Sequence, residues 1–367
     1  AMLGSRVRPV SPSAPAMTQY QITLRDGSLM EVSRTEAMHH AVDHGETLRV
    51  ADIIQEAPVV VSLPLDEMEN TALHLAAVRG YIDLVQLLIE AKARVNEANC
   101  ELAGRSTPLH LAAEENWADV AALLIFAQTE VDVPRGDGQT ALHLAAYGGN
   151  LATVKMLLQQ KADPLARESL GETPLHRAAY TGRIEVVREL LNTPQRQELL
   201  NCTSDARWTP LHAAAHGRHA QLVGELLEGG AILEAMDETS QTAMHKASHN
   251  GCCAVLKVLL EAAANVNGKD QSRWTPLHFA AMEGHAKAGK MLLEAGAEIV
   301  SPDGQALTPL HCATEEGHVG MCALLMQYRS DPTDITRARG GPTPLMIARS
   351  SGNEQLITLF EMAGVMA

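Results

Sequence analysis

Residues 140–149 read TALHLAAYGG, and this stretch decides the fold because the chain repeats it. A ninth copy, TPLM, begins at Thr343, and a weaker copy, EAMHHAVDHG, begins at Glu36. Steps between successive threonines are 33 to 36 residues, so ten units cover nearly everything after residue 35. The Thr-Ala/Pro-Leu/Met-His copies begin at Thr71, Thr107, Thr140, Thr173, Thr209, Thr242, Thr275 and Thr308.

The residue pattern of each unit predicts two helices. The threonine is a good N-cap, and the proline that often follows it suits the first helical position. Leu and paired Ala then give a short helix with a thin apolar face. A glycine stands nine residues after most of the threonines, where a left-handed helix end is expected. A second, amphipathic helix follows, as in 84–91, 151–160 and 255–262. Neither helix buries its apolar face alone, so the units must stack.

Thr-Pro-Leu-His-x-Ala at a period of 33 residues resembles the ankyrin repeat. The resemblance covers about nine-tenths of the chain. It implies an all-α solenoid of stacked helix-turn-helix units with β-hairpin fingers and a concave face of fingers and first helices. In this family the motif histidine joins hydrogen bonds between successive loops, so we expect His143 to be structural and neither a base nor a metal ligand. The matching positions are His74, His110, His143, His176, His212, His245, His278 and His311.

Three regions are expected along the chain. Residues 1–19 are rich in Pro and Ser and predict a disordered tail, in which Met17 is a candidate natural start. Residues 20–35 alternate apolar and polar side chains around Asp26-Gly27, which predicts a β-hairpin acting as an N-terminal cap. Residues 36–367 form the ankyrin-repeat domain of ten repeats, the first and last serving as caps.

The composition limits the choice of partners. Lys and Arg number 29 against 44 Asp and Glu, giving a net charge of −15. Such a surface repels phosphate backbones, so we expect no nucleic acid and favour a basic or amphipathic protein segment. The six cysteines are sparse and unevenly spaced, which favours reduced thiols and a cytoplasmic location. No apolar run is long enough to span a membrane. We expect a monomer.

The resemblance places two kinds of position on the concave groove: the residue before each threonine and the two residues after the paired alanines. Aromatic residues make up only 3% of the chain, yet four of them occupy such positions. Trp and Tyr are frequent interface anchors. The predicted partner-binding residues are Tyr147, Tyr180, Trp208, His216, His249, Trp274 and Met282.

Charged residues are expected to form a mixed rim around this groove. They keep the solenoid soluble and would steer a partner segment toward the aromatic centre. The predicted rim residues are Glu114, Glu115, Arg135, Arg167, Arg207, Arg273, Glu283, Glu315 and Glu316.

The repeat departs from its own rule at a few places. Extra residues precede Thr107 (NCELAGRS), Thr209 (with NTPQRQELL before it) and Thr343 (DITRARGGP), where the fingers should form. Pro194 should break or extend the second helix of its unit. Arg218 and Asn116 replace the helix-ending glycine, which predicts locally weaker caps.

Catalysis and metal binding are not expected. The chain has no GxGxxG, GxxxxGK[ST], HExxH or GxSxG motif, and no cofactor is predicted. The stretch HCATEEGHVGMC (311–322) has zinc-like spacing. However, His311 is the motif histidine, and His318 follows a glycine as His285 does in the preceding unit. The repeat therefore explains both histidines without a metal.

The sequence predicts a non-catalytic protein–protein interaction module or adaptor, with a partner segment docked across the repeats from Thr140 to Thr275. Two alternatives stay open. The groove would instead bind a small ligand or nucleotide by stacking on Trp208 or Trp274. Alternatively, the chain would be a substrate of asparagine hydroxylation at Asn96 or Asn267, since some ankyrin-like repeats are hydroxylated in the finger.

Overall fold

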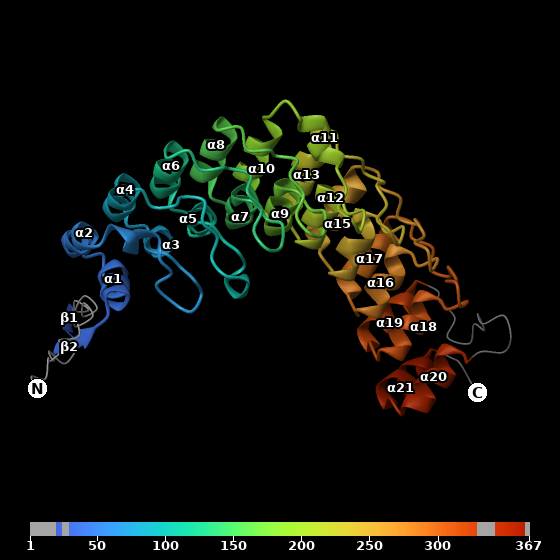
Figure 1. Cartoon of the computed structure of the whole chain (residues 1–367). Helices are drawn as coiled ribbons and strands as arrows, with labels where there is room; N and C mark the ends of the chain where they lie inside the picture. Colours follow the sequence, from blue (N-terminus) through green and yellow to red (C-terminus); the bar gives the residue numbers. More distant parts are fainter. Residues whose placement is uncertain (1–19, 24–28, 329–341, 364–367) are drawn as a thin grey trace, which may run out of the picture. The chain divides into compact units, whose positions relative to one another are not determined.

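The computed structural model of the chain describes residues 20–23, 29–328 and 342–363 (Figure 1). Within these residues there are 21 α-helices, two short 3-10 helices and two β-strands. Twenty of the α-helices form ten successive pairs, one pair per sequence repeat, and α11 stands between two pairs. The predicted all-α repeat solenoid is confirmed.

The first helices of the pairs are α1 Arg34–Asp43, α3 Ala72–Arg79, α5 Pro108–Glu114, α7 Ala141–Gly148, α9 Pro174–Thr181, α12 Pro210–His216, α14 Ala243–His249, α16 Pro276–Met282, α18 Pro309–Glu315 and α20 Pro344–Ser351. The second helices are α2 Thr47–Glu56, α4 Ile82–Glu90, α6 Ala118–Phe126, α8 Leu151–Gln159, α10 Ile184–Leu191, α13 Ala220–Glu228, α15 Cys253–Glu261, α17 Ala286–Glu294, α19 Val319–Gln327 and α21 Glu354–Met362. The remaining elements are α11 Arg196–Asn201, η1 Pro58–Ser62, η2 Glu101–Ala103, β1 Tyr20–Thr23 and β2 Leu29–Val32.

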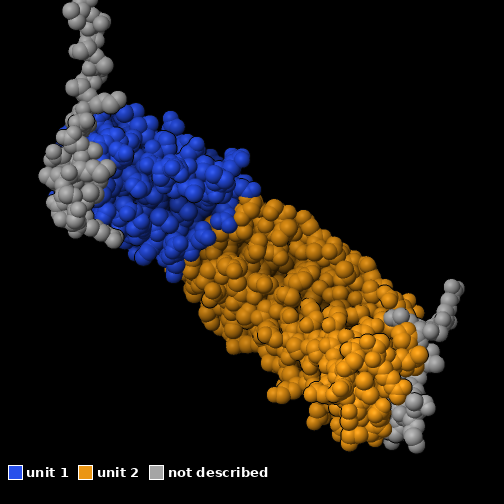
Figure 2. Space-filling view, turned by 90° about the horizontal axis from the view of Figure 1, so that it is seen from below, with its two compact units in different colours: residues 1–136 blue, residues 137–367 orange. Residues whose placement is uncertain are grey.

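The helices belong to two compact units, residues 1–136 and residues 137–367 (Figure 2). Within unit 2, each first helix from α7 to α20 packs on the first helix of the next pair, and each second helix packs behind its own first helix. Paired alanines such as Ala178 and Ala179 are fully buried between neighbouring first helices, which lets the helices approach closely. Leucines such as Leu175 and Leu190 fill the space between the two helices of a pair.

The two strands at the N-terminal end pair antiparallel, with Tyr20 opposite Val32 and Thr23 opposite Leu29. Strand β1 contacts α1, and the Tyr20 hydroxyl donates a hydrogen bond to the Glu56 carboxylate. The predicted turn at Asp26-Gly27 and the tail of residues 1–19 lie outside the described residues. The role of the hairpin as a cap stays a prediction.

A glycine ends most first helices. In the next repeat, the residue that follows the equivalent helix-ending position packs directly on this glycine. Gly182 has the predicted left-handed conformation, with φ of 73°. The His219 ring covers it, and His219 Nε2 donates to the Tyr180 carbonyl at 3.0 Å. His285 and His318 make the same contact with the His249 and Met282 carbonyls, at 3.0 and 2.8 Å. We call this series of contacts the glycine ladder; each contact joins two neighbouring repeats.

The glycine ladder is interrupted at Arg218. This residue replaces the glycine and is nevertheless left-handed, with φ of 69°, a conformation that costs a non-glycine residue roughly 1–2 kcal/mol. Its Cβ occupies the space that a ladder histidine would need, and the next repeat carries the small Cys252 in place of the histidine. Asn250 Nδ2 donates to the His216 carbonyl at 2.8 Å and so replaces the missing ladder bond. The weakness of this cap stays a prediction, and the Asn250 bond compensates for it locally.

The extra residues lie at different places in the two described insertions. Before Thr107 they enlarge the finger, whose tip carries η2, and Asn99 N–H donates to the Ser106 carbonyl at 3.0 Å across the loop. Before Thr209 the expectation of a longer finger is wrong. The finger keeps its ordinary five-residue form, closed by Ser204 N–H donating to the Trp208 carbonyl at 2.9 Å. The extra residues form α11 instead, because Pro194 prevents α10 from continuing. Most of the third insertion lies outside the described residues.

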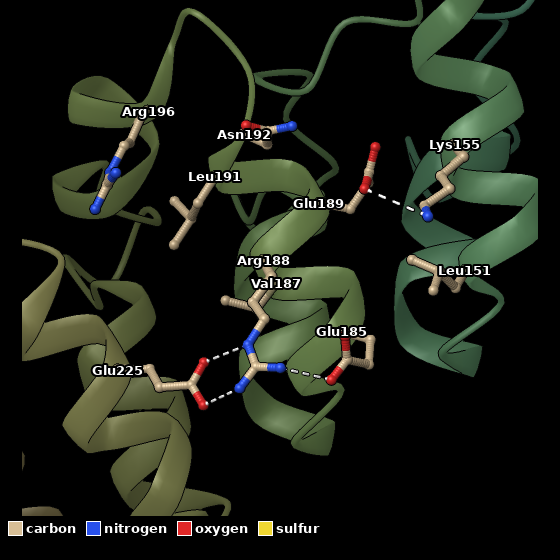
Figure 3. Close-up of a pocket in the computed structure, with 10 residues that line it drawn as sticks. All are labelled: Leu151, Lys155, Glu185, Val187, Arg188, Glu189, Leu191, Asn192, Arg196 and Glu225. Carbon is tan, nitrogen blue, oxygen red and sulfur yellow. Dashed lines mark hydrogen bonds and ion pairs between the residues drawn. The ribbon is translucent and has the colours of Figure 1, made fainter.

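The helix α11 leaves an outer cavity of about 400 Å³ beside α8, α10 and α13 (Figure 3). Arg188 on α10 spans it with a two-pronged ion pair to Glu225 on α13, at 2.9 and 2.7 Å, and a further contact to Glu185 at 2.7 Å. These pairs hold the second helices together where the insertion separates them. Lys155 and Glu189 of the same lining lie 3.9 Å apart.

The glycine ladder makes a testable stability prediction. Gly182→Ala should lower the free energy of unfolding by about 3 kcal/mol, because the new Cβ would lie 2.3 Å from His219 Nδ1 and displace the ring from the Tyr180 carbonyl. Gly352→Ala is the matched control: φ is 68° there, but no atom lies within 4 Å of the added Cβ. It should cost only about 1 kcal/mol, from backbone strain alone. Equal losses in urea unfolding would contradict the role of the ladder.

Candidate functional site

Six of the eight motif histidines tie their first helix to the finger that follows it. His143 Nδ1 accepts a hydrogen bond from Thr140 N–H at 3.2 Å and lies 3.0 Å from the Thr140 hydroxyl. Because Nδ1 accepts, the proton is on Nε2, which donates to the Glu172 carbonyl of the next finger at 3.1 Å. His176 repeats the pattern, with Nε2 donating to the Trp208 carbonyl at 2.8 Å. The expectation that His143 is structural is confirmed.

These histidines are neutral in the folded chain. Burial lowers the pKa of His143, His176 and His278 to about 4 each, against an ordinary value of 6.5. Burial also lowers the pKa of His74, His212 and His245. A proton on Nδ1 would remove the acceptor for the threonine N–H, so protonation opposes the fold. These side chains are fixed parts of the frame on which a binding surface is built.

The interruption of the glycine ladder coincides with a groove in unit 2, of about 540 Å³. It runs across the ends of α9, α12, α14 and α16. We use "the groove" for the surface lined by Tyr180, His216, Gly217, Arg218, His249, Asn250, Glu283 and His285.

Tyr180, His216 and Trp208 form one aromatic cluster at the groove. The Tyr180 and His216 rings stack with centroids 6.0 Å apart, and Trp208 lies 5.2 Å from the His216 ring. Tyr180 is 45% exposed, whereas His216 and Trp208 are partly buried. Lys246 Nζ lies 4.7 Å from the centre of the Trp208 ring, a cation–π contact. The finger before Thr209 thus places the aromatic ring of Trp208 in a fixed position beside the groove.

Lys246 is itself buried and paired. Its Nζ lies 2.6 Å from Asp237 Oδ2 and donates to Gln241 Oε1 at 2.8 Å. Asp237 also accepts from the N–H groups of Thr239 and Gln241, both at 2.9 Å. Its pKa is lowered by its bonds to Lys246 and to the backbone, against the opposing effect of burial. This network fixes the Trp208 ring from below.

Trp274 lies in a second cluster, centred on Phe279. The Trp274 ring contacts Phe279 edge-on at 5.2 Å, and Trp274 Nε1 donates to Asp303 Oδ2 at 2.8 Å. Phe279 in turn lies 6.1 Å from the His249 ring, and His249 Nδ1 is 3.4 Å from Glu283 Oε1. The second cluster therefore joins the groove through His249.

The structure brings together only some of the predicted binding residues. Tyr180, His216 and His249 line the groove, and the two tryptophans adjoin it. Glu283, predicted for the rim, also lies in the lining. Tyr147 is 49% exposed but does not line the groove. Met282 also lies outside the lining, and its carbonyl accepts the His318 ladder bond.

The predicted rim divides into several groups. Glu114, Glu115 and Arg135 belong to unit 1, where Arg135 lies 3.5 Å from Glu114. Arg167 pairs with Asp205 at 3.1 Å and donates to the Thr203 carbonyl at 2.7 Å, so it braces two fingers.

On the remaining rim positions, Glu315 and Glu316 lie exposed at the end of α18. Arg207 and Arg273 are exposed and left-handed, with φ of 58° and 61°. Neither arginine forms an ion pair within the described part of the chain.

Sequence reasoning missed several residues of this surface. Lys246 and Phe279 occupy the variable position between the motif histidine and the paired alanines, a position that the repeat pattern does not assign to the groove. The pattern identifies Arg218 only as a poor cap and does not predict its place in a groove. Its signal was available: an arginine where seven repeats carry glycine is a costly choice for the backbone.

The zinc-like stretch does not form a metal site. His311 is buried beside Thr308, whereas His318 Nε2 donates to the Met282 carbonyl. Burial raises the pKa of the Cys312 and Cys322 thiols to about 12 and about 11, so both stay protonated at neutral pH. Over the described ranges, no group of three or more His, Cys, Asp or Glu side chains is placed to hold a metal ion.

Stacked helix pairs, tied by motif histidines and presenting a row of fingers, define a repeat protein of the kind that binds partners on an extended surface. A family model of ankyrin repeats, spanning three copies, matches residues 38–135, 109–198, 196–270, 235–303 and 264–337. The chain belongs to the ankyrin-repeat family. Ankyrin repeats are in general protein–protein interaction modules and non-catalytic. Comparison with curated proteins gives no match. No described helix has the length and apolar character needed to cross a bilayer.

The neutral motif histidines predict how stability depends on pH. Their pKa is lower when folded than when unfolded, so the unfolded chain binds more protons between about pH 4 and 6.5. The stability they contribute is complete above pH 6.5 and is lost as pH falls toward 4. The urea midpoint should therefore drop steadily from pH 7 to pH 5. His39→Gln, outside this set, should leave the slope unchanged; a midpoint independent of pH would contradict the neutral assignment.

Proposed function

We propose that the chain is an adaptor or scaffold that binds a segment of a partner protein in the groove of unit 2. Its location is the cytoplasm and it acts as a monomer. The segment runs across the ends of α9, α12, α14 and α16, past Tyr180 and His216 at one side and His249 at the other. The binding mode is preorganised recognition, in which a rigid surface loses little conformational entropy when the partner docks.

The observation that carries this proposal is the pair of aromatic clusters beside an open groove. Trp208 and Trp274 are held by Lys246 and by Asp303, and neither tryptophan belongs to the Thr-Pro-Leu-His motif that caps and stacks the repeats. Tyr180 stays nearly half exposed although it stacks on His216. Fixed, partly exposed Trp and Tyr side chains are the usual anchors of protein interfaces.

Charge is expected to orient the partner. The net charge of −15 favours a basic or amphipathic segment during approach. Exposed Glu283, Glu315 and Glu316 follow one another at the ends of α16 and α18, so the basic part of the segment would lie toward α18. Such rim charges act mainly on the association rate.

The alternatives find less support. For nucleotide stacking, Trp274 is already occupied by its contacts with His278 at 5.8 Å and Phe279, and Lys246 covers one face of Trp208. For asparagine hydroxylation, Asn267 uses both amide atoms to bind the next finger, through the Gly296 carbonyl at 3.1 Å and Glu298 N–H at 2.8 Å. An enzyme would have to break these bonds to reach it. Groove binding therefore comes first.

Substitution of the anchors tests the proposal. Tyr180→Ala combined with Trp208→Ala should weaken binding of the physiological partner at least thirtyfold, since an anchor truncation costs about 2 kcal/mol or more. Phe126→Ala is the matched control, because Phe126 is an aromatic side chain that is 82% exposed at the end of α6, outside the groove. Affinity purification from lysate with quantitative mass spectrometry, using variants whose circular dichroism is unchanged, would compare them. Partners that stay bound to the double variant would exclude the groove.

A further inference from the structure

Three arginines around the groove share an unusual backbone conformation. Arg207, Arg218 and Arg273 have φ of 58°, 69° and 61°, in the left-handed region where glycine is favoured. All three are exposed. At the finger position of Arg207 and Arg273 the other repeats are left-handed too, with Gly138, Gly171, Ser240 or Ala306 there, so the finger imposes this conformation and does not require a long side chain. Arg218 differs, because it stands where seven repeats carry glycine, and backbone strain at such a position points to a function for the side chain.

Among the residues that the structure describes, the same three arginines have no acidic partner. Arg218 donates to the Asn250 carbonyl, and no ion pair is formed by Arg207, Arg218 or Arg273 within the described residues. Some cations of the first helices are paired, whereas the finger residues Arg105 and Lys269 form no ion pair within the described residues either. Arg177 lies 3.1 Å from Glu172, and Lys246 lies 2.6 Å from Asp237. The three guanidinium groups therefore have no carboxylate of the described residues to neutralise them.

Arg218 has donors to spare where the groove is open. The guanidinium carries five N–H donors, and one donates to the Asn250 carbonyl. Asn250 Nδ2 approaches His216 Nδ1 at 3.3 Å, which makes Nδ1 the acceptor and leaves Nε2 as a donor. Cys252 stands where other repeats carry a ladder histidine and is much smaller, and Arg218 lies in the lining of the groove. Donors of the geometry that binds a carboxylate therefore line an open part of the surface.

The finger arginines extend this pattern along the surface. Arg207 and Arg273 each precede a tryptophan, in the repeated sequence RWTPLH. Their repeats are two apart, and stacked helices lie about 8–10 Å from one another, so equivalent positions are roughly 16–20 Å apart. Five or six residues of extended chain span that distance at about 3.3 Å each.

We propose that the groove recognises acidic side chains of the partner segment, with a carboxylate bound by Arg218 and others by the finger arginines. Resting on the proposed function, this inference adds the chemistry of the ligand: an amphipathic segment with Asp or Glu five or six residues apart. An apolar or aromatic side chain of the segment packs on Tyr180 and Trp208. Net charge alone favours a basic segment, whereas the unpaired arginines select acidic groups at these points.

Selection from a random dodecapeptide library displayed on phage, against the immobilised full chain, tests the inference. The selected peptides should be enriched in Asp and Glu, and Arg218→Gly should weaken the best of them at least tenfold, as expected for loss of a charge-assisted pair. Glycine suits the left-handed backbone, so this variant should melt no lower than the wild type. Arg196→Ala, an exposed arginine on α11, is the control and should bind within twofold of the wild type.

A double-mutant cycle completes the test. Replacing the key Glu of the peptide by Gln should weaken binding to the wild type tenfold and have no effect on Arg218→Gly. Selected peptides without acidic side chains, or equal binding to both proteins, would overturn the acidic assignment while leaving the groove intact. A phosphoserine peptide that binds over tenfold more tightly than the Glu peptide would reassign the site to phosphate. If the selected peptides bind the double variant Tyr180→Ala, Trp208→Ala as tightly as the wild type, the groove is not the peptide-binding site. Failure to select any peptide would likewise exclude the groove as a peptide-binding site.

Discussion

The hydrogen bonds of the motif histidines are the constraint on which the structure depends. At six of the eight motif positions the ring accepts from its own threonine N–H and donates to the carbonyl of the next finger, as His176 does with Thr173 and Trp208. A buried ring meets both requirements only in one tautomer and without a second proton. The position of each finger held in this way, and of the residue at its end, follows from this contact. Trp208 is placed beside the groove because its carbonyl is the acceptor for His176.

The groove arises where a second rule of the stack is relaxed. In most repeats a glycine ends the first helix and a ring from the next repeat covers it, as His219 covers Gly182. Arg218 breaks this rule, and Cys252 and Asn250 adapt to it, so the stack stays intact while its surface opens. A single substitution at a contact that serves only stability thus creates a distinct surface on an otherwise regular stack.

The repeats, helix pairs and structural histidines were predictable because one local pattern recurs and each copy confirms the others. The site was predicted less completely. Tyr180, His216 and His249 were found because they interrupt a known frame, whereas Lys246 and Phe279 act through contacts between repeats that no single unit reveals. Likewise, the sequence before Thr209 shows three extra residues, but whether they enlarge the finger or form α11 depends on Pro194 and on packing against α12.

Hydrogen–deuterium exchange of the full chain, with and without its captured partner, tests the central claim that the groove is the binding surface. Partner binding is predicted to slow exchange at the ends of α9, α12 and α14, around Thr181, Gly217 and Asn250, and in the finger that carries Trp208. The amides of the outer helices α10, α13 and α15 should be unaffected. Protection confined to those outer helices, with none at the groove, would contradict the account.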